Sequence, residues 1–270
     1  MHYGAAKLTD ISVITATLNS EAWLQRCIDS VLEQENVAVQ HVLIDGGSTD
    51  GTIDILNWQQ DPRVHVLLGQ DSGVYEAWNK GVRAARGDWI LFLGSDDFLL
   101  APDVFRKAMD LLHDKKGQRV FAYGNVLKGN VDGSGTPERY GYWDPTSKAW
   151  GGPTKPYPPH PSTLHSRELF AAYPWYDETY RYSADSKFFH ENQNDAEIHH
   201  LDFDMVWFST GGLTNRKGNQ LHRWRESNRL RRELAMTPPI HVLSKSFLSA
   251  LKHDSIYWLS NIWGRKLKRN

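Results

Sequence analysis

Short apolar segments alternate with helical patterns through the first hundred residues, and this alternation constrains the fold more than any other feature. Five consecutive apolar residues at 89–93 are typical of a strand buried on both faces. Similar strands are predicted at 11–17, 39–44 and 64–68, with helical patterns between them. Strand and helix that alternate four times over about 90 residues predict an α/β fold with a parallel, doubly wound sheet.

The clearest helical pattern covers residues 74–85. Its apolar positions recur with the period of one helix face and are Val74, Ala77, Trp78, Gly81, Val82 and Ala85. Asn79 and Lys80 then fall on the other faces.

Asn19 and Ser20 follow the first strand, at 11–17. Either residue is predicted to cap the helix that comes directly after this strand.

Two adjacent carboxylates, Asp96 and Asp97, follow the strand at 89–93. In an open α/β sheet, ligands bind beyond the carboxyl ends of the strands. Neighbouring like charges repel, and a hard divalent cation stabilises both as anions. A metal that grips a diphosphate is one interpretation, and a solvated turn before a helix is the other. The two are equally compatible with this pair of residues alone.

Two common phosphate-binding loops are absent. The first strand is followed by Thr17-Leu18-Asn19 instead of Gly-x-Gly-x-x-Gly, and the chain has no Gly-x-x-x-x-Gly-Lys-Ser/Thr sequence. These absences argue against an ordinary dinucleotide-binding unit and against a P-loop nucleotide hydrolase.

The composition is that of a globular protein, with 270 residues, 40% of them hydrophobic and 23% charged. The single cysteine, Cys27, excludes a disulfide framework and favours a reducing compartment. Met1–Gly4 do not resemble a secretory leader, and no apolar run reaches the roughly 18–20 residues that span a bilayer. We therefore expect a cytoplasmic protein.

The C-terminal part is strongly basic. Residues 216–270 contain 13 Lys/Arg and 3 Asp/Glu, although the whole chain carries a net charge of −1. The segment also has a rough apolar stripe, from Leu243 through Phe247 and Leu251 to Trp258 and Ile262. This pattern is typical of an amphipathic helix that lies on an anionic membrane surface or packs on a protein. A solvated basic face without a partner is the alternative.

Residues 101–215 show a looser pattern. Strands are predicted at 119–126 and 198–208, a hairpin turn at 128–135, a capped helix at 166–170 and a basic helix at 219–235. The loop at 145–161 is rich in Pro, Gly and aromatic residues, and loops of this length usually bind a ligand. Asp185 is predicted in the first turn of a helix that starts after Ser183, where an acid also simply complements the helix dipole.

The order of these motifs resembles that of family-2 glycosyltransferases with the GT-A fold, in particular the bacterial polysaccharide-assembly branch that includes colanic acid glycosyltransferases. The matching motifs are Ile11–Asn19, Asp45–Thr52, Asp71–Gly81, Gly94–Asp97, His160–Ser162, Ser183–Asp185 and Gly211–Thr214. The resemblance implies a Rossmann-like, mainly parallel sheet with flanking helices. It divides the chain into a GT-A domain at 1–215, with a nucleotide-sugar half at 10–100 and an acceptor half at 101–215, and a basic helical segment at 216–270.

The resemblance also implies site residues. The nucleoside-diphosphate sugar would contact Thr15, Thr17, Asn19, Asp45, Asp71, Asn79, Lys80 and Asp96. Asp97 would coordinate Mn²⁺ or Mg²⁺ on the two phosphates. Asp96 would lie beside the ribose or the metal. Relatives often have Ser-Gly-Asp where this chain has Ser95-Asp96-Asp97, so the resemblance supports only Asp97 as the metal ligand.

Three further roles come from the same resemblance. Asp185 matches the general base of inverting transfer. His160 matches a histidine that contacts the acceptor or the diphosphate, with a structural loop histidine as the alternative. Gln220-Leu-His-Arg223-Trp224 fits the Gln-x-x-Arg-Trp acceptor motif of processive synthases, although a basic helix with a buried tryptophan is the favoured interpretation.

The expected activity is inverting, metal-dependent transfer of one sugar from a nucleotide donor to a glycan or lipid-linked acceptor in cell-surface polysaccharide synthesis. A catalytically silent GT-A domain that binds nucleotide sugar or scaffolds an assembly complex is the first alternative. A nucleotidyltransferase is the second, but it would carry a Gly-rich basic loop after the first strand. No nucleic-acid partner is expected, and the basic segment suggests peripheral attachment to the inner face of the cell membrane.

Overall fold

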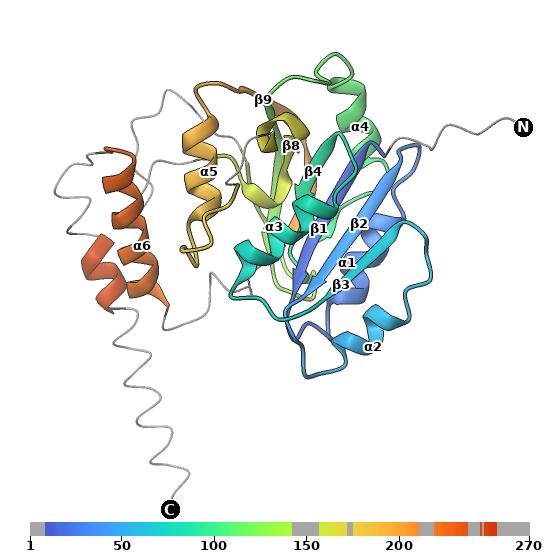
Figure 1. The fold of residues 1–270 in the computed structure, drawn as a ribbon, viewed down its shortest axis with the longest axis horizontal. Helices are drawn as coiled ribbons and strands as arrows, with labels where there is room; N and C mark the ends of the chain where they lie inside the picture. The colour runs from blue at the N-terminus through green and yellow to red at the C-terminus, as the bar shows by residue number, and fades with distance from the viewer. Residues whose placement is uncertain are drawn as a thin grey trace, which may run out of the picture.

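The protein forms one mixed sheet covered by helices on both faces (Figure 1). The computed structural model describes residues 9–141, 157–171, 175–210, 219–236, 244 and 246–252. The strands follow the order β3-β2-β1-β4-β8-β6-β9-β5, and β7 pairs with β6 outside this path.

The first half of the sheet is parallel, as predicted. Its strands are β1 (Ile11–Thr17), β2 (Val39–Asp45), β3 (Val64–Leu68) and β4 (Trp89–Phe92). β1 and β2 are buried along their whole length apart from Ala16, as expected for strands that are covered on both faces. The bounds of β1 and β3 agree with the sequence prediction.

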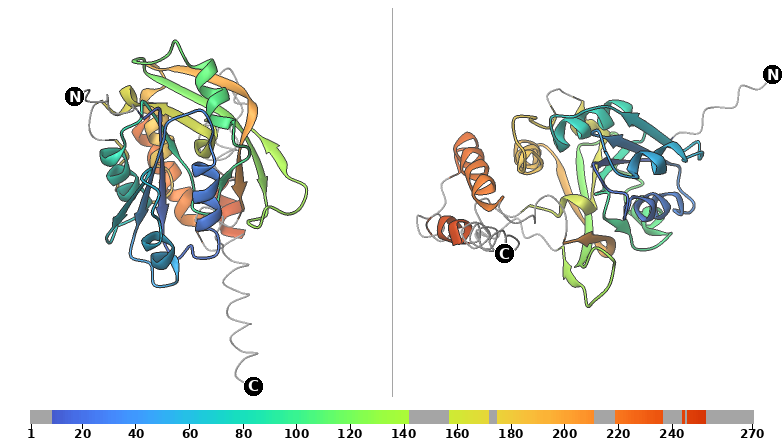
Figure 2. Two further views of the ribbon diagram at one scale, coloured as in Figure 1. Left: turned by 90° about the vertical axis from the view of Figure 1, so that its right-hand side faces the viewer. Right: turned by 90° about the horizontal axis from the view of Figure 1, so that it is seen from below.

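Beyond β4 the sheet is mixed. The strands there are β5 (Phe98–Leu99), β6 (Val120–Gly129), β7 (Glu138–Tyr140), β8 (Thr163–Ser166) and β9 (Glu197–Ser209). β8 lies antiparallel between β4 and β6, whereas β6 and β9 run parallel. The β6–β7 hairpin forms one end of the molecule in the left view of Figure 2. β8 was not predicted, because four residues are too few to show a strand period.

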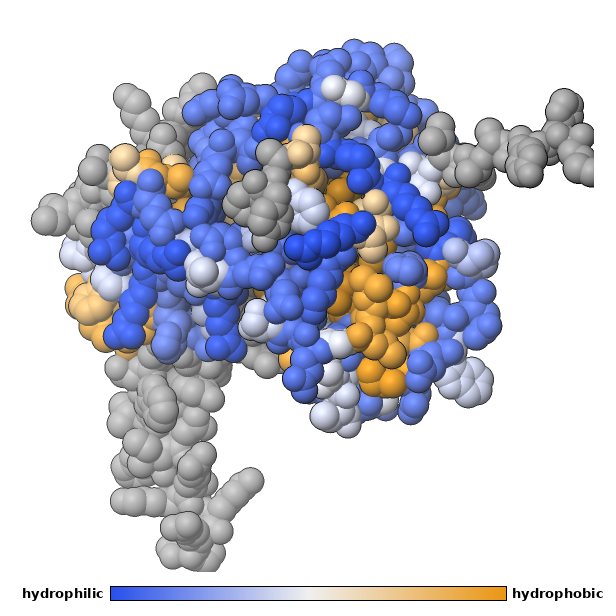
Figure 3. All heavy atoms as spheres, viewed as in Figure 1, coloured by the Kyte–Doolittle hydropathy of each residue, from blue (hydrophilic) through white to orange (hydrophobic). Residues whose placement is uncertain are grey.

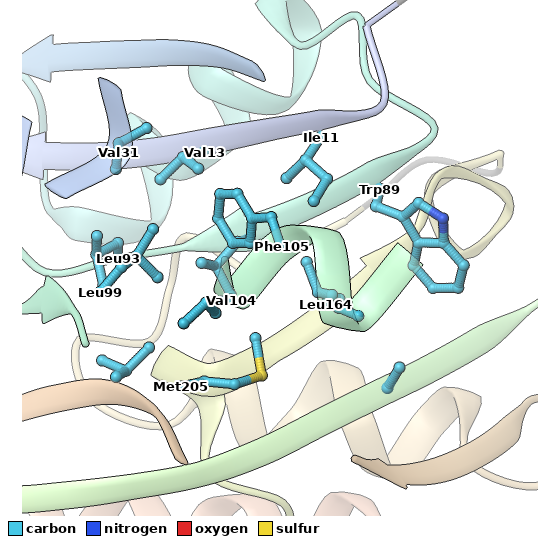
Figure 4. Packing of buried hydrophobic residues seen from close by; sticks show 14 of the residues in the cluster. Ile11, Val13, Val31, Trp89, Leu93, Leu99, Val104, Phe105, Leu164 and Met205 are labelled. Atoms are coloured by element: carbon cyan, nitrogen blue, oxygen red, sulfur yellow. The ribbon is translucent and has the colours of Figure 1, made fainter. Parts of the chain in front are cut away.

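Helices cover both faces of the sheet. They are α1 (Leu24–Leu32), α2 (Thr52–Asn57), α3 (Val74–Ala84), α4 (Val104–Leu111) and α5 (Ala184–Asn192). α1 and α4 bury their apolar faces against β1, β4 and β9, and Figure 4 shows Val31, Val104 and Phe105 packed among residues of these strands. α3 and α5 form a second cluster on the opposite face.

α3 approaches the sheet closely at Gly81. A Cβ atom there would lie 2.4 Å from Cγ2 of Ile14 in β1, so only glycine fits without a shift of the strand or the helix. The buried face of α3 also differs from the prediction, since Tyr75 and Asn79 are buried while Val74 and Trp78 are only partly covered. The helix is therefore buried on more than its apolar stripe.

Two local predictions are wrong. α1 starts after Trp23 without a side-chain cap, because Asn19 has φ 53° and its side chain bonds a different loop. Residues Arg167–Phe170 form a 3₁₀ turn rather than a capped α-helix. In both places tertiary contacts replaced the local cap.

The basic helix at 219–235 is confirmed as α6 (Gln220–Glu233). Its Leu230 is fully buried in the cluster that contains Phe188 of α5. Trp224 of α6 contacts the helical residues 246–252, with its ring centroid 4.7 Å from that of Phe247. The right view of Figure 2 shows these helices beside α5, at the opposite end from β3. No helix in the described part of the chain is long and apolar enough to cross a membrane.

The outer edge of the parallel half carries an apolar groove. Ile44, Leu67, Leu68 and Ala84 line it, and Lys80 and Arg83 belong to its rim. Figure 3 shows an apolar area on the β3 side of the molecule, whereas the rest of this face is mainly hydrophilic.

Candidate active site

The strand register brings the predicted nucleotide-binding motifs to one edge of the sheet. Thr17 of β1 pairs with Asp45 of β2, which pairs with Leu68 of β3, so these three strands end at the same level. β4 lies on the other side of β1, and the Ser95 hydroxyl after it is 2.8 Å from that of Ser20. The four loops that follow these strands therefore share the ligand-binding edge expected for a parallel α/β sheet.

Thr17 and Asp71 present polar atoms at this edge that are buried and lack a hydrogen-bond partner within the described residues. These atoms are Thr17 Oγ1 and Asp71 Oδ2. Gly46 lies close to both residues: a Cβ at Gly46 would lie 3.5 Å from Asp71 Oδ2 and 3.8 Å from the Thr17 carbonyl. Buried polar atoms are normally hydrogen-bonded, and an unsatisfied one requires an explanation. A polar ligand in this position would supply the missing bonds.

Lys80 is paired with Asp71. Its ammonium group bonds Asp71 Oδ1 and lies 3.0 Å from Glu76 Oε1, and these two acids raise its pKa. The remaining oxygen of Asp71 is the unpartnered one. Lys80 therefore fixes the orientation of the Asp71 carboxylate.

Asp45 and Asn19 shape the loop that follows β2. Asp45 is buried, and its Oδ1 accepts the N–H groups of Gly47 and Ser48, each at 2.8 Å. The Asn19 side chain accepts the N–H of Thr49 at 2.8 Å. Both side chains therefore fix the backbone of the predicted nucleotide loop, and any ligand contact would be additional to this role.

Thr15 and Asn79 lie away from the edge. Thr15 is fully buried, with Oγ1 at 3.0 Å from Nε2 of the equally buried His41. Asn79 is fully buried and bonds the backbone N–H and carbonyl of Tyr176. Their polar groups are used inside the protein, so we leave both residues out of the proposed ligand contacts. Spacing alone could not show this, because it does not reveal which side chains the opposite half of the chain covers.

Asp96 and Asp97 converge on Gly94. A Cβ at Gly94 would lie 2.6 Å from Asp97 Oδ2 and 3.1 Å from Asp96 Oδ1, so both carboxylates face the space that glycine leaves free. Asp97 is only 4% exposed, and its Oδ1 accepts the N–H of Ser209 at 2.7 Å. Burial, and then the charge of Asp96, raise the pKa of Asp97 well above its ordinary value.

This pair fits a divalent metal. Two carboxylate oxygens are hard ligands, and a cation would relieve the repulsion that disfavours the ionised form of Asp97. Within the described residues, no group of three His, Cys, Asp or Glu side chains converges as a closed metal cage. That also fits, because Mg²⁺ in phosphate sites is typically held by one or two carboxylates, with substrate phosphates and water as the other ligands.

Arg26 of α1 contacts the turn that contains Asp96 and Asp97. Its Nη2 donates to the backbone carbonyl of Asp96 at 3.1 Å and to that of Val131 at 2.5 Å. The guanidinium lies 4.2 Å from the ring centroid of Phe98. Arg26 and the Ser209 N–H thus hold the Asp96-Asp97 turn between the two halves of the sheet.

Asp185 lies in the first turn of α5, as predicted. Its Oδ1 accepts the hydroxyl of Tyr75 at 3.1 Å, and its Oδ2 accepts that of Tyr157 at 3.1 Å. Burial raises the pKa of Asp185 above its ordinary value, although hydrogen bonds from the Ser186 N–H and from the two tyrosines lower it. A carboxylate with a raised pKa is a stronger base, which suits proton abstraction.

His160 lies in an aromatic layer between β4 and α3. Its ring stacks on Trp78, with centroids 4.8 Å apart, and its Nε2 is 3.1 Å from the hydroxyl of Tyr176. Burial lowers the pKa of His160 to about 3, so the ring is neutral. These contacts agree with the alternative that His160 is a structural loop histidine, and they do not test a contact with an acceptor.

The Gln-x-x-Arg-Trp sequence lies at the start of α6. Arg223 Nη1 donates to Gln220 Oε1 at 3.4 Å, and Trp224 Nε1 donates to Ser246 Oγ at 3.2 Å. Trp224 therefore joins α6 to the following helical residues. These contacts support the packing interpretation and leave an acceptor role for Arg223 and Trp224 as a proposal.

Sequence reasoning missed the residues that surround the three acids. Tyr75 lies within the motif at 71–81 and Tyr157 within the aromatic loop at 145–161, so their positions gave a signal that was not used. Arg26 and Ser209 act on the Asp96-Asp97 turn from segments far away in the sequence. No local pattern marks either of them.

Comparison with known proteins agrees with this arrangement. The family model described as glycosyl transferase family 2 matches residues 12–173. The chain belongs to this family. A PGL/p-HBAD biosynthesis glycosyltransferase of Mycobacterium bovis is 39% identical over 119 residues, which are 43% of this chain and 46% of the relative. The succinoglycan biosynthesis protein ExoO of Rhizobium meliloti is 38% identical over 128 residues, 47% of this chain and 36% of that protein. The chain thus matches less than half of either relative's length.

Solved structures show the same fold. The structure of S. aureus TarS 1-349 in complex with UDP-GlcNAc has a TM-score of 0.59 at 17% identity, covering 90% of this chain and 72% of that one. The mannosyltransferase PcManGT of Pyrobaculum calidifontis, in complex with GDP-Man and Mn²⁺, has a TM-score of 0.59 at 17% identity, covering 95% and 80%. This family-2 glycosyltransferase therefore has the GT-A fold.

Proposed function

We propose that the protein transfers one sugar, with inversion, from a nucleoside-diphosphate sugar to a hydroxyl of a glycan or lipid-linked saccharide. The observation that carries this proposal is Asp185, a partly buried carboxylate held by two tyrosine hydroxyls at the N-terminus of α5. Such a group can accept the proton of an attacking hydroxyl. Single displacement with one base gives inversion at the anomeric carbon.

The donor would occupy the edge formed by the loops after β1 to β4. Asp71, oriented by Lys80, and Thr17 offer the unsatisfied oxygens that a nucleoside's hydroxyl or N–H groups can bond. Relatives of this fold support a nucleotide donor, since TarS is solved with UDP and UDP-GlcNAc and PcManGT with GDP-Man and Mn²⁺. The glycosyltransferase and succinoglycan relatives support a role in bacterial glycan assembly.

Asp97, with Asp96, would hold Mn²⁺ or Mg²⁺. When bound, the cation would neutralise the charge that develops on the leaving diphosphate. The protein's own part is to keep both carboxylates turned towards Gly94, through the N–H of Ser209 on Asp97 and Arg26 on the Asp96 carbonyl. This preorganisation removes the cost of gathering two repelling charges when donor and metal arrive.

The alternative of a silent domain that only binds nucleotide sugar is disfavoured by Asp185. In Asp185, burial raises the pKa of the carboxyl group and hydrogen bonds from two tyrosines lower it. A domain that only binds nucleotide sugar has no need for such a tuned carboxylate. The nucleotidyltransferase alternative is disfavoured by the sequence after β1, which lacks a Gly-rich basic loop.

A thermal-shift screen tests the donor site. We expect UDP or GDP, and the matching nucleotide sugar, to raise the melting temperature in the presence of Mn²⁺ and much less with EDTA. At 100 times its dissociation constant, a ligand stabilises the native state by about 2.7 kcal/mol. ADP and CDP serve as matched controls for the base. If no nucleoside diphosphate changes the melting temperature with Mn²⁺, the proposed donor site is wrong.

The basic residues after position 215 support a second proposal, that this region binds an anionic membrane surface on which a lipid-linked acceptor would lie. Phe247, Leu248 and Leu251 are exposed on the helical residues 246–252, next to the arginine-rich α6. We expect co-sedimentation with phosphatidylglycerol vesicles at low salt, and loss of it at high salt. Protein that stays in the supernatant at low salt would contradict this.

A further inference from the structure

One carboxylate of α6, that of Glu226, bonds the backbone of the chain segment that leads into α5. Glu226 Oε1 accepts the N–H of Arg181 at 2.7 Å, and Oε2 accepts the N–H of Tyr182 at 2.8 Å. Both oxygens of Glu226 are thereby bonded to consecutive backbone groups. Hydrogen bonds from backbone N–H groups to a carboxylate are stronger than those to a neutral acceptor, so the two bonds form a firm attachment.

The attachment lies immediately before the proposed base. Ser183 occupies the N-cap position of α5 but makes no side-chain capping bond, and α5 begins at Ala184. Asp185 follows three residues after Tyr182. The direction in which α5 starts therefore depends on Glu226, which comes from a helix some forty residues later in the chain.

The other side of Asp185 is fixed by α3 and by Tyr157. The two hydroxyls that reach its carboxylate, from Tyr75 and Tyr157, lie at 3.1 Å, so a small rotation of the start of α5 would lengthen both bonds. Tyr176 also interacts electrostatically with Asp185: burial, and then the charge of Asp185, raise the pKa of Tyr176. The tyrosine hydroxyls thus hold the Asp185 carboxylate itself, and the Glu226 attachment holds the backbone that precedes it.

Glu233, at the end of α6, contacts the same segment in a different way from Glu226. Its Oε2 bonds the Tyr180 hydroxyl at 2.8 Å and lies 3.2 Å from Lys187 Nζ. Lys187 keeps a second partner, Asp177, at 2.7 Å. Among the described residues, Glu233 therefore binds the same segment through side chains only, without a hydrogen bond to the backbone that leads into α5.

We propose that Glu226 is a positioning residue for the base, fixing the start of α5 so that the Asp185 carboxylate meets the acceptor hydroxyl in line with the donor. This inference rests on the proposed function and extends it to the region after residue 215. It gives Glu226 of α6 a role in positioning the proposed base. The resemblance to Gln-x-x-Arg-Trp proteins assigns nothing to Glu226.

Glu226→Gln tests the proposal, with Glu233→Gln as matched control on the same helix. The readout is donor hydrolysis with Mn²⁺, measured as release of UDP or GDP. We expect Glu226→Gln to lower kcat by about 10- to 100-fold, because small misplacements of a reacting group have effects of this size. The KM for the donor is expected to stay unchanged, since the nucleotide edge is not involved.

The pH profile distinguishes positioning from general weakening. Hydrogen bonds from Tyr75 and Tyr157 lower the pKa of Asp185, so a variant that loosens them should move the acid limb of kcat to higher pH. Tyr157→Phe, which removes one of these bonds directly, calibrates the size of the shift. Glu233→Gln is expected to keep the wild-type limb and to change kcat by less than about fivefold, as a partly exposed ion pair contributes little.

The proposal is overturned if Glu226→Gln keeps wild-type kcat and acid limb, or if both variants lose activity equally without a shift. Should Glu226→Gln not fold, Glu226→Asp gives the same test, because its shorter carboxylate still reaches one N–H group and should shift the limb in the same direction. A wild-type protein that turns over no nucleotide sugar refutes the proposed function itself, which is a different result from an active wild type with an unaffected Glu226 variant.

Discussion

Asp185→Asn is expected to reduce kcat for sugar transfer by about 10²- to 10⁴-fold, the range that a positioned general base contributes. Asparagine has nearly the same shape: its oxygen can accept one of the two hydroxyls of Tyr75 and Tyr157, and its amide nitrogen can donate to the oxygen of the other. It cannot take a proton from the acceptor. The loss should therefore appear in kcat, whereas donor binding, followed by the thermal shift with UDP or GDP and Mn²⁺, should be unchanged.

The pH dependence of the wild type follows from the same group. Asp185 acts as a base only when ionised, and burial raises its pKa above the ordinary value. Activity should therefore rise with pH through this raised pKa and reach a plateau above it, and the acid limb should lie at higher pH than for an ordinary aspartate. Its neighbours that titrate, Tyr75, Tyr157 and Tyr176, all have pKa values raised by burial, so they stay protonated across this limb.

Asp177→Asn is the matched control for this experiment. Asp177 lies in the same segment, but it pairs with Lys187 at 2.7 Å and makes no contact with Asp185 in the described hydrogen-bond network. Its substitution should change stability modestly and leave the acid limb in place. If Asp185→Asn retains wild-type turnover, or if Asp177→Asn reproduces its loss, the base lies elsewhere.

Asp97→Ala should abolish both the Mn²⁺-dependent thermal shift and donor turnover. The substitution removes one of the two carboxylates that face Gly94, and with it the charge that fits a divalent ion. It also leaves the Ser209 N–H without its acceptor, which costs about 1–3 kcal/mol of stability. Asp97→Asn keeps an oxygen acceptor for that N–H, so it separates loss of metal binding from loss of folding.

The measurement is calorimetric titration of Mn²⁺ in the presence of UDP or GDP. Asp103→Asn, at the start of α4 a few residues further on, is the control for a general loss of negative charge; it pairs with Arg106 and Lys107 on the surface. We expect it to bind Mn²⁺ as the wild type does. Unchanged Mn²⁺ binding in Asp97→Asn would remove Asp97 from the proposed metal site.

The parallel half of the fold was predictable because its information is local. The apolar run Trp89–Leu93 is typical of a strand buried on both faces, and the helical patterns between successive strands favour parallel connections. The acids at the strand ends followed directly, since parallel strands present their carboxyl ends at one edge. The resemblance then supplied the role of Asp185, whose place in the first turn of α5 is confirmed.

Other features depended on contacts between segments far apart in the sequence. Asn79 and Lys80 are adjacent on α3, yet the chain at Tyr176 covers the first, whereas the second reaches Asp71. Glu226 of α6 attaches to the backbone before α5, across more than forty residues. Nothing in the local pattern of either residue distinguishes these outcomes.

By itself, the sequence determined the alternating strands and helices of the parallel half, which edge of the sheet carries the acids, and the family to which the chain belongs. Only the tertiary structure decided which of those polar groups remain unsatisfied, such as Asp71 Oδ2, and which are consumed by packing, such as the Asn79 amide. The physical reason is that periodicity reports burial of a whole face, whereas hydrogen bonding and desolvation depend on the single atoms that a distant segment brings into contact.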